Sequence, residues 1–202
     1  MNIGKKGGLK MSKITRIGII AEDESDFEAT KVIVKRIIKT DKIGFKPRTS
    51  NGCGKLKRKA FDYAVDLHRR GCDLLILFHD LDRNVLVQLE KELQEKLNGN
   101  PFENYFVCIP IEELEAWYLS DPESIKKTLN LKRKPKIKAK PETIKSPKEY
   151  LGELIYSCSD KEKIYLNTKH NQMLSENVSI QLMRTNCKSF EKLYDFINKH
   201  EY

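Results

Sequence analysis

The sequence predicts an α/β fold, with a mostly parallel sheet of about four strands between two layers of helices and a mainly helical C-terminal extension. Apolar runs of strand length alternate three times with stretches of helical periodicity, and a fourth such run follows. One run, residues 74–78 (LLILF), is apolar without interruption. Such a run is typical of a strand buried on both faces of a parallel sheet.

Composition narrows the class of protein. A chain of 202 residues, 39% hydrophobic and 33% charged, fits a soluble globular protein of one domain with an appendage or of two small domains. No apolar stretch approaches the ~20 residues of a transmembrane helix, so we expect no membrane partner. The 38 basic and 29 acidic residues give a net charge of +9, which favours an anionic partner, most often nucleic acid.

Cysteine usage and the N-terminus indicate where the protein works. Five cysteines without a CxxC pair predict neither a disulfide framework nor a zinc site, and a reducing cytoplasm fits best. Residues 1–10 lack the apolar core of a signal peptide, and Met11 offers an alternative start. We expect residues 1–13 to lie outside the fold, either disordered or added to the natural chain.

The first predicted strand, residues 14–21, ends in an acidic stretch. Ser25 followed by Glu28 is a capping-box pattern and predicts a helix that starts there. Asp26, in the first turn, is explained by the helix dipole. Capping does not explain Glu22, which would face a crevice at the end of the strand.

A short strand is predicted at residues 43–49, before the segment SNGCGKLKRK. Its glycines hint at a phosphate loop, but the Walker pattern needs glycine where Thr49 stands and Ser or Thr where Leu56 stands, which argues against ATP binding by this motif. A basic helix start could still hold a nucleic-acid phosphate, and a solvated charged turn explains it equally well. The following helix would stop at Gly71.

The buried strand 74–78 is followed by Asp80 and Asp82. Because side chains alternate along a strand, both aspartates would point the same way from its carboxyl end if the extended geometry persists. Open α/β sheets bind ligands at that end. Two close carboxylates repel each other unless a cation neutralises them, and oxygen ligands suit Mg²⁺ or Mn²⁺. The alternative is that one aspartate caps the next helix and the other is solvated.

A helix over residues 85–97 and a strand over 105–110 follow, and then the segment IEELEAWYLSDP. On a helix Glu112 and Glu115 would share one face, while Trp117 would pack against the sheet. We expect Glu115 to add a carboxylate to the site; the alternative is that both glutamates are solvated.

Residues 126–148 carry ten lysines and arginines among three prolines, with few large apolar residues. Such a stretch cannot bury enough surface to fold alone, so we expect a mobile basic loop. It would contact phosphates, or serve only as a solvated linker. Helical patterns resume after residue 149.

These features resemble a known superfamily. A strand ending in Glu22, a later strand ending in Asp80 and Asp82, and the alternating topology resemble the Toprim domain. Within it, the segments PIEELEAWYLSD and KHNQMLSENVSIQLMRTNCKSFEKLYDFI are similar to small bacterial Toprim-like proteins of uncharacterised function, related to the overcoming-lysogenization-defect nucleases. The sequence departs from the Toprim motif at one position: Asp23 follows Glu22 where Toprim domains have glycine.

The resemblance implies a three-layer, Toprim-like (Rossmann-like) domain over residues 14–121. With the composition of the rest of the chain, we expect a basic loop over 122–148, the part that the resemblance matches least, and a helical extension over 149–202 packed on the first domain. The resemblance also implies a nuclease with Mg²⁺ or Mn²⁺ as cofactor. The expected catalytic residues are Glu22, Asp80 and Asp82, and the expected metal ligands are these three with Glu115. The expected nucleic-acid contacts are Lys55, Lys57, Arg58, Arg83, Lys134, Lys136, Lys169 and His170.

Several functional alternatives follow from the same residues. Hydrolysis of DNA or RNA, as part of a mobile-element or phage-defence system and with a protein partner such as an ATPase, is the first hypothesis. A non-catalytic nucleic-acid-binding or partner-binding Toprim-like module is the second. A phosphoacceptor receiver domain would also need a lysine at the end of a fifth strand, which the sequence does not place. A topoisomerase or primase would need further domains.

Overall fold

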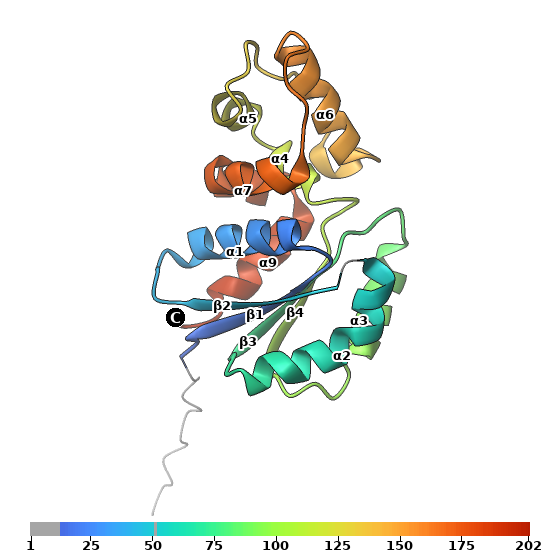
Figure 1. Cartoon of the computed structure of the whole chain (residues 1–202), viewed down its shortest axis with the longest axis vertical. Helices are drawn as coiled ribbons and strands as arrows, with labels where there is room; N and C mark the ends of the chain where they lie inside the picture. The colour runs from blue at the N-terminus through green and yellow to red at the C-terminus, as the bar shows by residue number, and fades with distance from the viewer. Residues whose placement is uncertain (1–12, 51) are drawn as a thin grey trace, which may run out of the picture.

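The computed structural model describes residues 13–50 and 52–202 and shows the predicted α/β architecture (Figure 1). Its sheet has four parallel strands in the order β2-β1-β3-β4. Their bounds are Arg16–Ala21 for β1, Gly44–Thr49 for β2, Leu74–Phe78 for β3 and Asn104–Cys108 for β4. The prediction of a mostly parallel sheet of about four strands is therefore confirmed. The expected terminal segment 1–13 lies, except for Lys13, outside the described residues.

The two central strands, β1 and β3, pair directly with each other, with Ile20 opposite Leu77. All five residues of β3 are buried, as its unbroken apolar sequence predicts. Because all four strands are parallel, their carboxyl ends meet at one edge of the sheet. The segments after β1 and after β3 are therefore neighbours at that edge.

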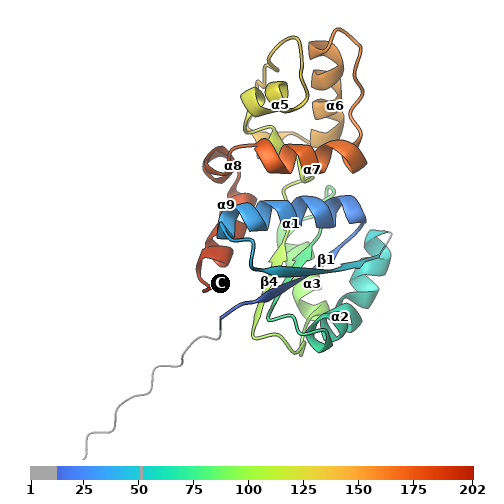
Figure 2. The same ribbon diagram turned by 60° about the vertical axis from the view of Figure 1, so that its left-hand side comes forward.

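Helices cover both faces of the sheet (Figures 1 and 2). Helices α2 (Cys53–Arg69) and α3 (Leu86–Lys96) cover one face, and α1 (Glu24–Ile38) and α9 (Lys188–Asn198) cover the other. Gly18 lets α2 approach closely, because a Cβ atom there would lie 3.1 Å from the Leu67 side chain. Alternate residues of β3 feed the two cores, Ile76 on the α1 side and Leu77 on the α2 side.

The helices between β4 and α9 form the helical extension, which lies over α1; it starts before the predicted residue 149 and does not include α9, which covers the sheet. It contains α4 (Glu115–Tyr118), α5 (Pro122–Thr128), the 3-10 helix η1 (Pro141–Thr143), α6 (Pro147–Cys158), α7 (Asn167–Asn177) and α8 (Ile180–Asn186). Helix α7 runs along α1 in both ribbon views (Figures 1 and 2). No helix of the described residues is long and apolar enough to cross a bilayer.

Trp117 ties this extension to the sheet. Its ring meets Phe78 of β3 and Phe190 of α9 edge-on, with centroid distances of 5.9 and 5.1 Å. Its indole Nε1 donates to Ser189 Oγ at 2.8 Å, so the buried N–H group is satisfied. The prediction that Trp117 packs against the sheet is confirmed.

Two local predictions near the site are wrong. Helix α1 is capped by Asp23, whose Oδ1 accepts from Asp26 N at 3.0 Å, whereas Ser25 Oγ donates to Asn167 O. The helix expected across Glu112 and Glu115 has only one turn and begins at Glu115. Glu112 has φ 61°, a left-handed conformation that a helix cannot contain.

The basic segment 126–148 is packed against its neighbours, contrary to the expectation of a mobile loop. Its first residues belong to α5, Leu129 and Leu131 are buried, and Ile137 and Ile144 are partly buried against the core. Arg133 N donates to Cys158 O at 3.0 Å, and its guanidinium lies 2.9 Å from Asp160. The segment does not need to fold alone, because α5 and α6 supply the apolar surface that its own sequence lacks.

Candidate functional site

Acidic side chains gather at the edge where the central strands end. Asp80 follows β3, Asp26 projects from the first turn of α1, and Glu115 opens α4. We refer to these three carboxylates as the acidic cluster. Its members interact strongly, because each of the other two charges raises the pKa of Asp80.

Asp80 is partly exposed, and the main chain fixes its position. Its Oδ1 accepts from Leu114 N at 3.1 Å, and its own carbonyl oxygen lies 2.6 Å from Nδ1 of the buried His79. Because a carbonyl can only accept, the neutral His79 ring carries its proton on Nδ1. Burial, followed by the charges of Asp26 and Glu115, raises the pKa of Asp80 well above its ordinary value.

Asp26 belongs to the same cluster, although the sequence assigned it only to the helix dipole. Burial and then the charges of Asp23, Glu115 and Glu22 raise its pKa to about 8, and the charge of Lys148 opposes the shift. The acidic run after β1 carried a signal that the capping argument missed. It has four acids in five positions, of which a helix start needs only one for its cap.

Glu115 turns inward and is only 3% exposed. Burial raises its pKa, and a hydrogen bond from the Tyr165 hydroxyl to Oε1, at 2.8 Å, works against this rise. The charge of Glu115 raises the pKa of both Asp26 and Asp80, so Glu115 lies near these two carboxylates, whereas the sequence placed it beside Asp80 and Asp82. Glu112, the alternative from the same segment, faces the neighbouring loop instead.

A buried polar network supports Glu115 from the side of α7. The Tyr165 hydroxyl also contacts the side-chain amide of Asn171, and the Tyr118 hydroxyl lies 3.1 Å from Asn171 O and 2.7 Å from Ser175 Oγ. One hydroxyl proton cannot serve two acceptors. Both contacts of Tyr165 are hydrogen bonds when Glu115 is protonated and donates, or when the amide of Asn171 presents its nitrogen.

Asp82 does not have the extended backbone on which its expected direction depended. Extended geometry ends at Asp80, because Asp82 and Arg83 have φ 50° and 62°. Backbone hydrogen bonds fix this turn: Asp82 N donates to Glu112 O, and Arg83 N donates to Glu112 Oε2, both at 3.0 Å. Asp82 is exposed and lines a polar hollow of about 310 Å³ together with Arg83 and Lys145. Its charge nevertheless contributes to the raised pKa of Asp80.

Glu22 lies at the margin of the cluster. It is half-buried, its backbone carbonyl accepts from Ser50 N at 3.2 Å, and its charge contributes to the raised pKa of Asp26. Glu113 is a further marginal carboxylate: burial raises its pKa, and its Oε2 accepts from Lys148 N at 2.8 Å. Sequence reasoning did not single out Glu113.

No Lys, Arg or His nitrogen of the described residues lies within 4.0 Å of a carboxylate of the cluster. The cluster offers oxygen donors only, which suit Mg²⁺ or Mn²⁺ in their chemistry. In the side-chain positions seen for residues 13–50 and 52–202, no three His, Cys, Asp or Glu groups are arranged so that they could hold one metal ion.

The predicted basic contacts lie in four separate places, one of which is Arg83 in the turn after β3. Lys55, Lys57 and Arg58 lie in the first turns of α2, and Lys57 is paired with Glu92 at 2.8 Å. Helix α2 begins at Cys53 behind Gly52, whose φ of 132° suits only glycine. Asn51 of the suspected phosphate loop lies outside the described residues.

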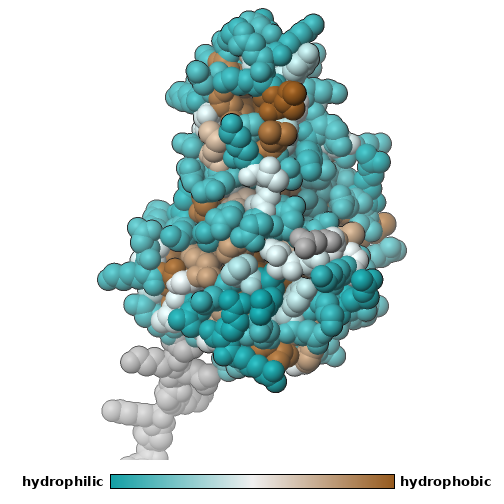
Figure 3. All heavy atoms as spheres, viewed as in Figure 1, coloured by the Kyte–Doolittle hydropathy of each residue, from teal (hydrophilic) through white to brown (hydrophobic). Residues whose placement is uncertain are grey.

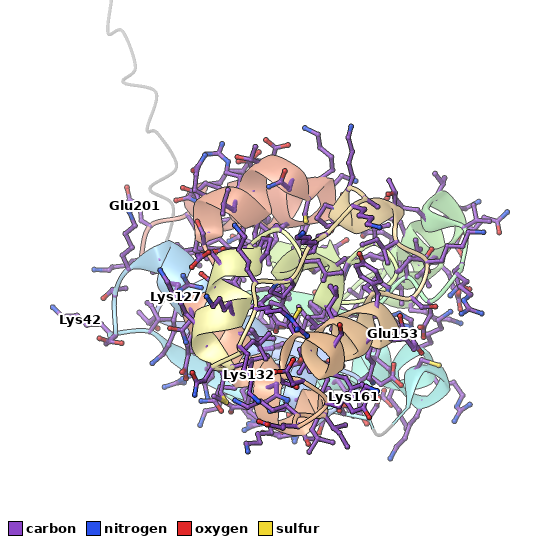
Figure 4. The ribbon with its side chains drawn as sticks, turned by 90° about the horizontal axis from the view of Figure 1, so that it is seen from above. Lys42, Lys127, Lys132, Glu153, Lys161 and Glu201 are labelled. Atoms are coloured by element: carbon purple, nitrogen blue, oxygen red, sulfur yellow. The ribbon has the colours of Figure 1, made fainter. Side chains whose placement is uncertain are left out.

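The other basic residues lie towards the helical end, where Figure 4 labels Lys127, Lys132 and Lys161 around α5 and α6. Lys134 lies 3.8 Å from Glu123, so its charge is partly compensated, whereas Lys136 is exposed. The predicted contacts Lys169 and His170 stand at the start of α7.

Comparison with protein families gives one match. The family described as "Domain of unknown function (DUF4276)" matches residues 21–198, which is most of the chain. The chain belongs to this family. The matched region contains the acidic cluster and the helical extension. No curated protein and no solved structure gives a significant match. The Toprim resemblance of this DUF4276 chain stays a prediction.

Proposed function

We propose that this protein is a metal-dependent nuclease that hydrolyses phosphodiester bonds of DNA or RNA. The observation that carries the proposal is the acidic cluster at the carboxyl ends of β1 and β3. Its carboxylates have no salt-bridge partner among the residues that the structure describes, and they raise the pKa values of one another. Carboxylates at this edge of a parallel sheet stand where open α/β folds bind ligands. A divalent cation would remove their repulsion.

In this hydrolysis, metal binding and proton transfer would fall to different residues. Asp26, Asp80 and Glu115 would hold Mg²⁺ or Mn²⁺, which supplies charge neutralisation at the phosphate and lowers the pKa of the attacking water. Glu22, at the margin of the cluster, would accept the proton of that water. Tyr165 and Asn171 keep Glu115 turned inward.

Basic groups beside the cluster would bind the phosphate chain. Arg83 and Lys145 line the polar hollow next to Asp82, and Arg83 Nη2 donates to Ser146 Oγ at 3.2 Å. Lys148 is exposed at the start of α6, and its charge reaches Asp26. With a net charge of +9, the whole molecule would also attract a polyanion.

A non-catalytic nucleic-acid-binding or partner-binding module is the second candidate. It is favoured by the side-chain positions of the described residues, none of which form a ready metal site, and by Asp23 in the place of the Toprim glycine. In either case we place the protein in the cytoplasm, within a defence or mobile-element system. Its free cysteines Cys53, Cys72, Cys108, Cys158 and Cys187 suit a reducing compartment.

The test is a cleavage assay with labelled single-stranded and double-stranded DNA and RNA, in the presence of Mg²⁺, Mn²⁺ or chelator. We expect metal-dependent cleavage that Asp80→Asn lowers at least about 100-fold, because this change removes a central ligand. Asp62→Asn, an exposed aspartate on α2, is the matched control and should keep full activity. Binding without cleavage under every metal condition would favour the second candidate.

A further inference from the structure

A second hollow, of about 380 Å³, lies between α5, α6 and α7. Its walls are apolar and are formed by Leu129, Ile155, Ile164, Leu166 and Met173. Ile164 and Leu166 are 71% and 53% exposed, among the most exposed large hydrophobic side chains of the described residues. Figure 3 shows hydrophobic atoms on the upper part of this face, over the helical extension. We call this hollow the apolar groove.

The charged residues that line the groove are all basic: Lys163, Lys169 and His170. Lys163 Nζ donates to the carbonyl oxygens of Leu129 and Asn130, at 2.5 and 2.9 Å, which fixes its ammonium at the wall. Neither lysine has a carboxylate at salt-bridge distance among residues 13–50 and 52–202. Burial and then these two charges lower the pKa of His170. An anionic group would relieve this positive field.

His170 presents a hydrogen-bond donor as well as an apolar face. Its Nδ1 accepts from Leu166 N at 2.9 Å, so the neutral ring carries its proton on Nε2. One face of the ring stacks on Tyr165, with a centroid distance of 5.7 Å and an interplanar angle of 23°. A planar ligand in the groove would therefore meet apolar walls, a ring and a donor.

Tyr165 connects the groove to the acidic cluster. Its ring stacks on His170, and its hydroxyl donates to Glu115 Oε1 at 2.8 Å. The two sites are thus separated by a single side chain. A chain molecule bound in the groove would therefore lie near the acidic cluster.

We propose that the apolar groove binds one unpaired nucleobase, with the adjacent phosphate on Lys169, and so selects single-stranded nucleic acid. This inference deepens the proposed function, on which it rests for the path of the nucleic-acid strand from the groove towards the acidic cluster. Apolar walls with basic groups at the rim complement a base joined to a phosphate. A paired base inside a duplex cannot enter such a hollow without leaving its stack.

The test measures binding in chelator, so that it does not depend on cleavage. Labelled strands are compared by fluorescence anisotropy: a short single strand, the same strand made abasic, and the blunt duplex. We expect Ile164→Ser to weaken binding of the intact single strand by roughly 5- to 10-fold, as for the loss of one base contact, and to leave the abasic strand unchanged. Lys169→Gln should weaken the binding of both single strands.

Matched controls are available elsewhere on the surface. Val87 is 74% exposed on α3 and Lys42 is exposed before β2, so Val87→Ser and Lys42→Gln should leave every affinity unchanged. Melting temperatures of all variants should stay at the wild-type value, because the replaced side chains are exposed.

Three results would overturn the inference: an unchanged single-strand affinity in Ile164→Ser, an equal loss for the abasic strand, or binding of an acidic apolar peptide in place of any strand. Failure of the proposed function is seen separately, as an absence of cleavage with Mg²⁺ and Mn²⁺. Base-dependent binding without cleavage would support the groove as a base-binding site and contradict the nuclease proposal. If Ile164→Ser leaves both cleavage and binding unchanged, the nuclease proposal stands and the groove proposal fails.

Discussion

The hydroxyl of Tyr165 donates to Glu115 Oε1 at 2.8 Å, across 50 residues of sequence. This bond joins α4, which follows the sheet, to the segment that leads into α7. It also works against the rise in the pKa of Glu115 that burial causes. The position and the protonation of Glu115 therefore both depend on a residue of the helical extension.

Tyr165→Phe should expose this dependence. Loss of a buried hydrogen bond should lower the free energy of unfolding by about 1–2 kcal/mol, which thermal or urea unfolding would measure. The pKa of Glu115 should rise, so the pH profile of any metal-dependent activity should move to higher pH. Tyr156→Phe is the control, since Tyr156 is 44% exposed and its hydroxyl has no hydrogen bond in the described structure. Equal behaviour of the two variants would contradict the role given to Tyr165.

Asp26→Asn should stabilise the metal-free protein at alkaline pH. The pKa of Asp26 is raised from 3.8 to about 8, so between these values the folded state binds a proton that the unfolded state releases. Stability from this group is complete below pH 4 and is lost as pH rises towards 8. Asparagine resembles the protonated acid, so the melting temperature at pH 8 should rise by a few degrees, or about 1 kcal/mol. At pH 4 the variant should match the wild type.

Added Mg²⁺ gives the complementary result for Asp26. The cation should raise the melting temperature of the wild type at pH 8 and have a smaller effect on Asp26→Asn. A wild-type melting temperature that does not depend on millimolar Mg²⁺ would contradict a metal site at the acidic cluster.

Glu115→Gln and Glu112→Gln form a matched pair from one segment. Glu115 lies in the acidic cluster, so its replacement should lower metal-dependent activity by at least about tenfold while folding is kept. Glu112 uses its carboxylate to accept from Arg83 N, a bond that the oxygen of glutamine can keep. Its replacement should be nearly silent, and similar losses in the two variants would argue against a specific role for Glu115.

The lysines of segment 126–148 should contribute unequally to binding. Lys132, Arg133 and Lys134 have acidic partners, whereas Lys136, Lys138 and Lys140 are exposed and have none among the described residues. Replacing Lys136, Lys138 and Lys140 by glutamine should lower the slope of log affinity against log salt concentration for single-strand binding by up to about 2, at roughly 0.7 for each contact. The same replacement of Lys132, Arg133 and Lys134 should change this slope less. Identical slopes for both variants would show that the segment does not contact phosphate.

The sequence predicted the features that depend on local pattern. The apolar run 74–78 indicated a strand buried on both faces, and parallel pairing then placed Asp80 at the ligand-binding edge. Glu115 was predicted correctly as an inward carboxylate, although the helix expected to present it is a single turn. The fold class followed from the same alternation of strands and helices.

The features that depend on distant contacts were missed. Asp82 was misplaced because Asp82 and Arg83 adopt left-handed conformations, which non-glycine residues rarely take. Those conformations are held by hydrogen bonds to Glu112, which lies in the loop that follows β4. Tyr165 and Asn171 have no local signal, since their role exists only once α7 lies on α1.

Trp117 is the only tryptophan of the chain, and it is fully buried between β3, α4 and α9. The tryptophan fluorescence of this protein therefore comes from one indole, two residues from Glu115. Its emission is a label-free reporter of how the helical extension sits on the sheet. An unfolding curve followed by this emission, set beside one followed by far-ultraviolet circular dichroism, would separate undocking of the extension from loss of the helices.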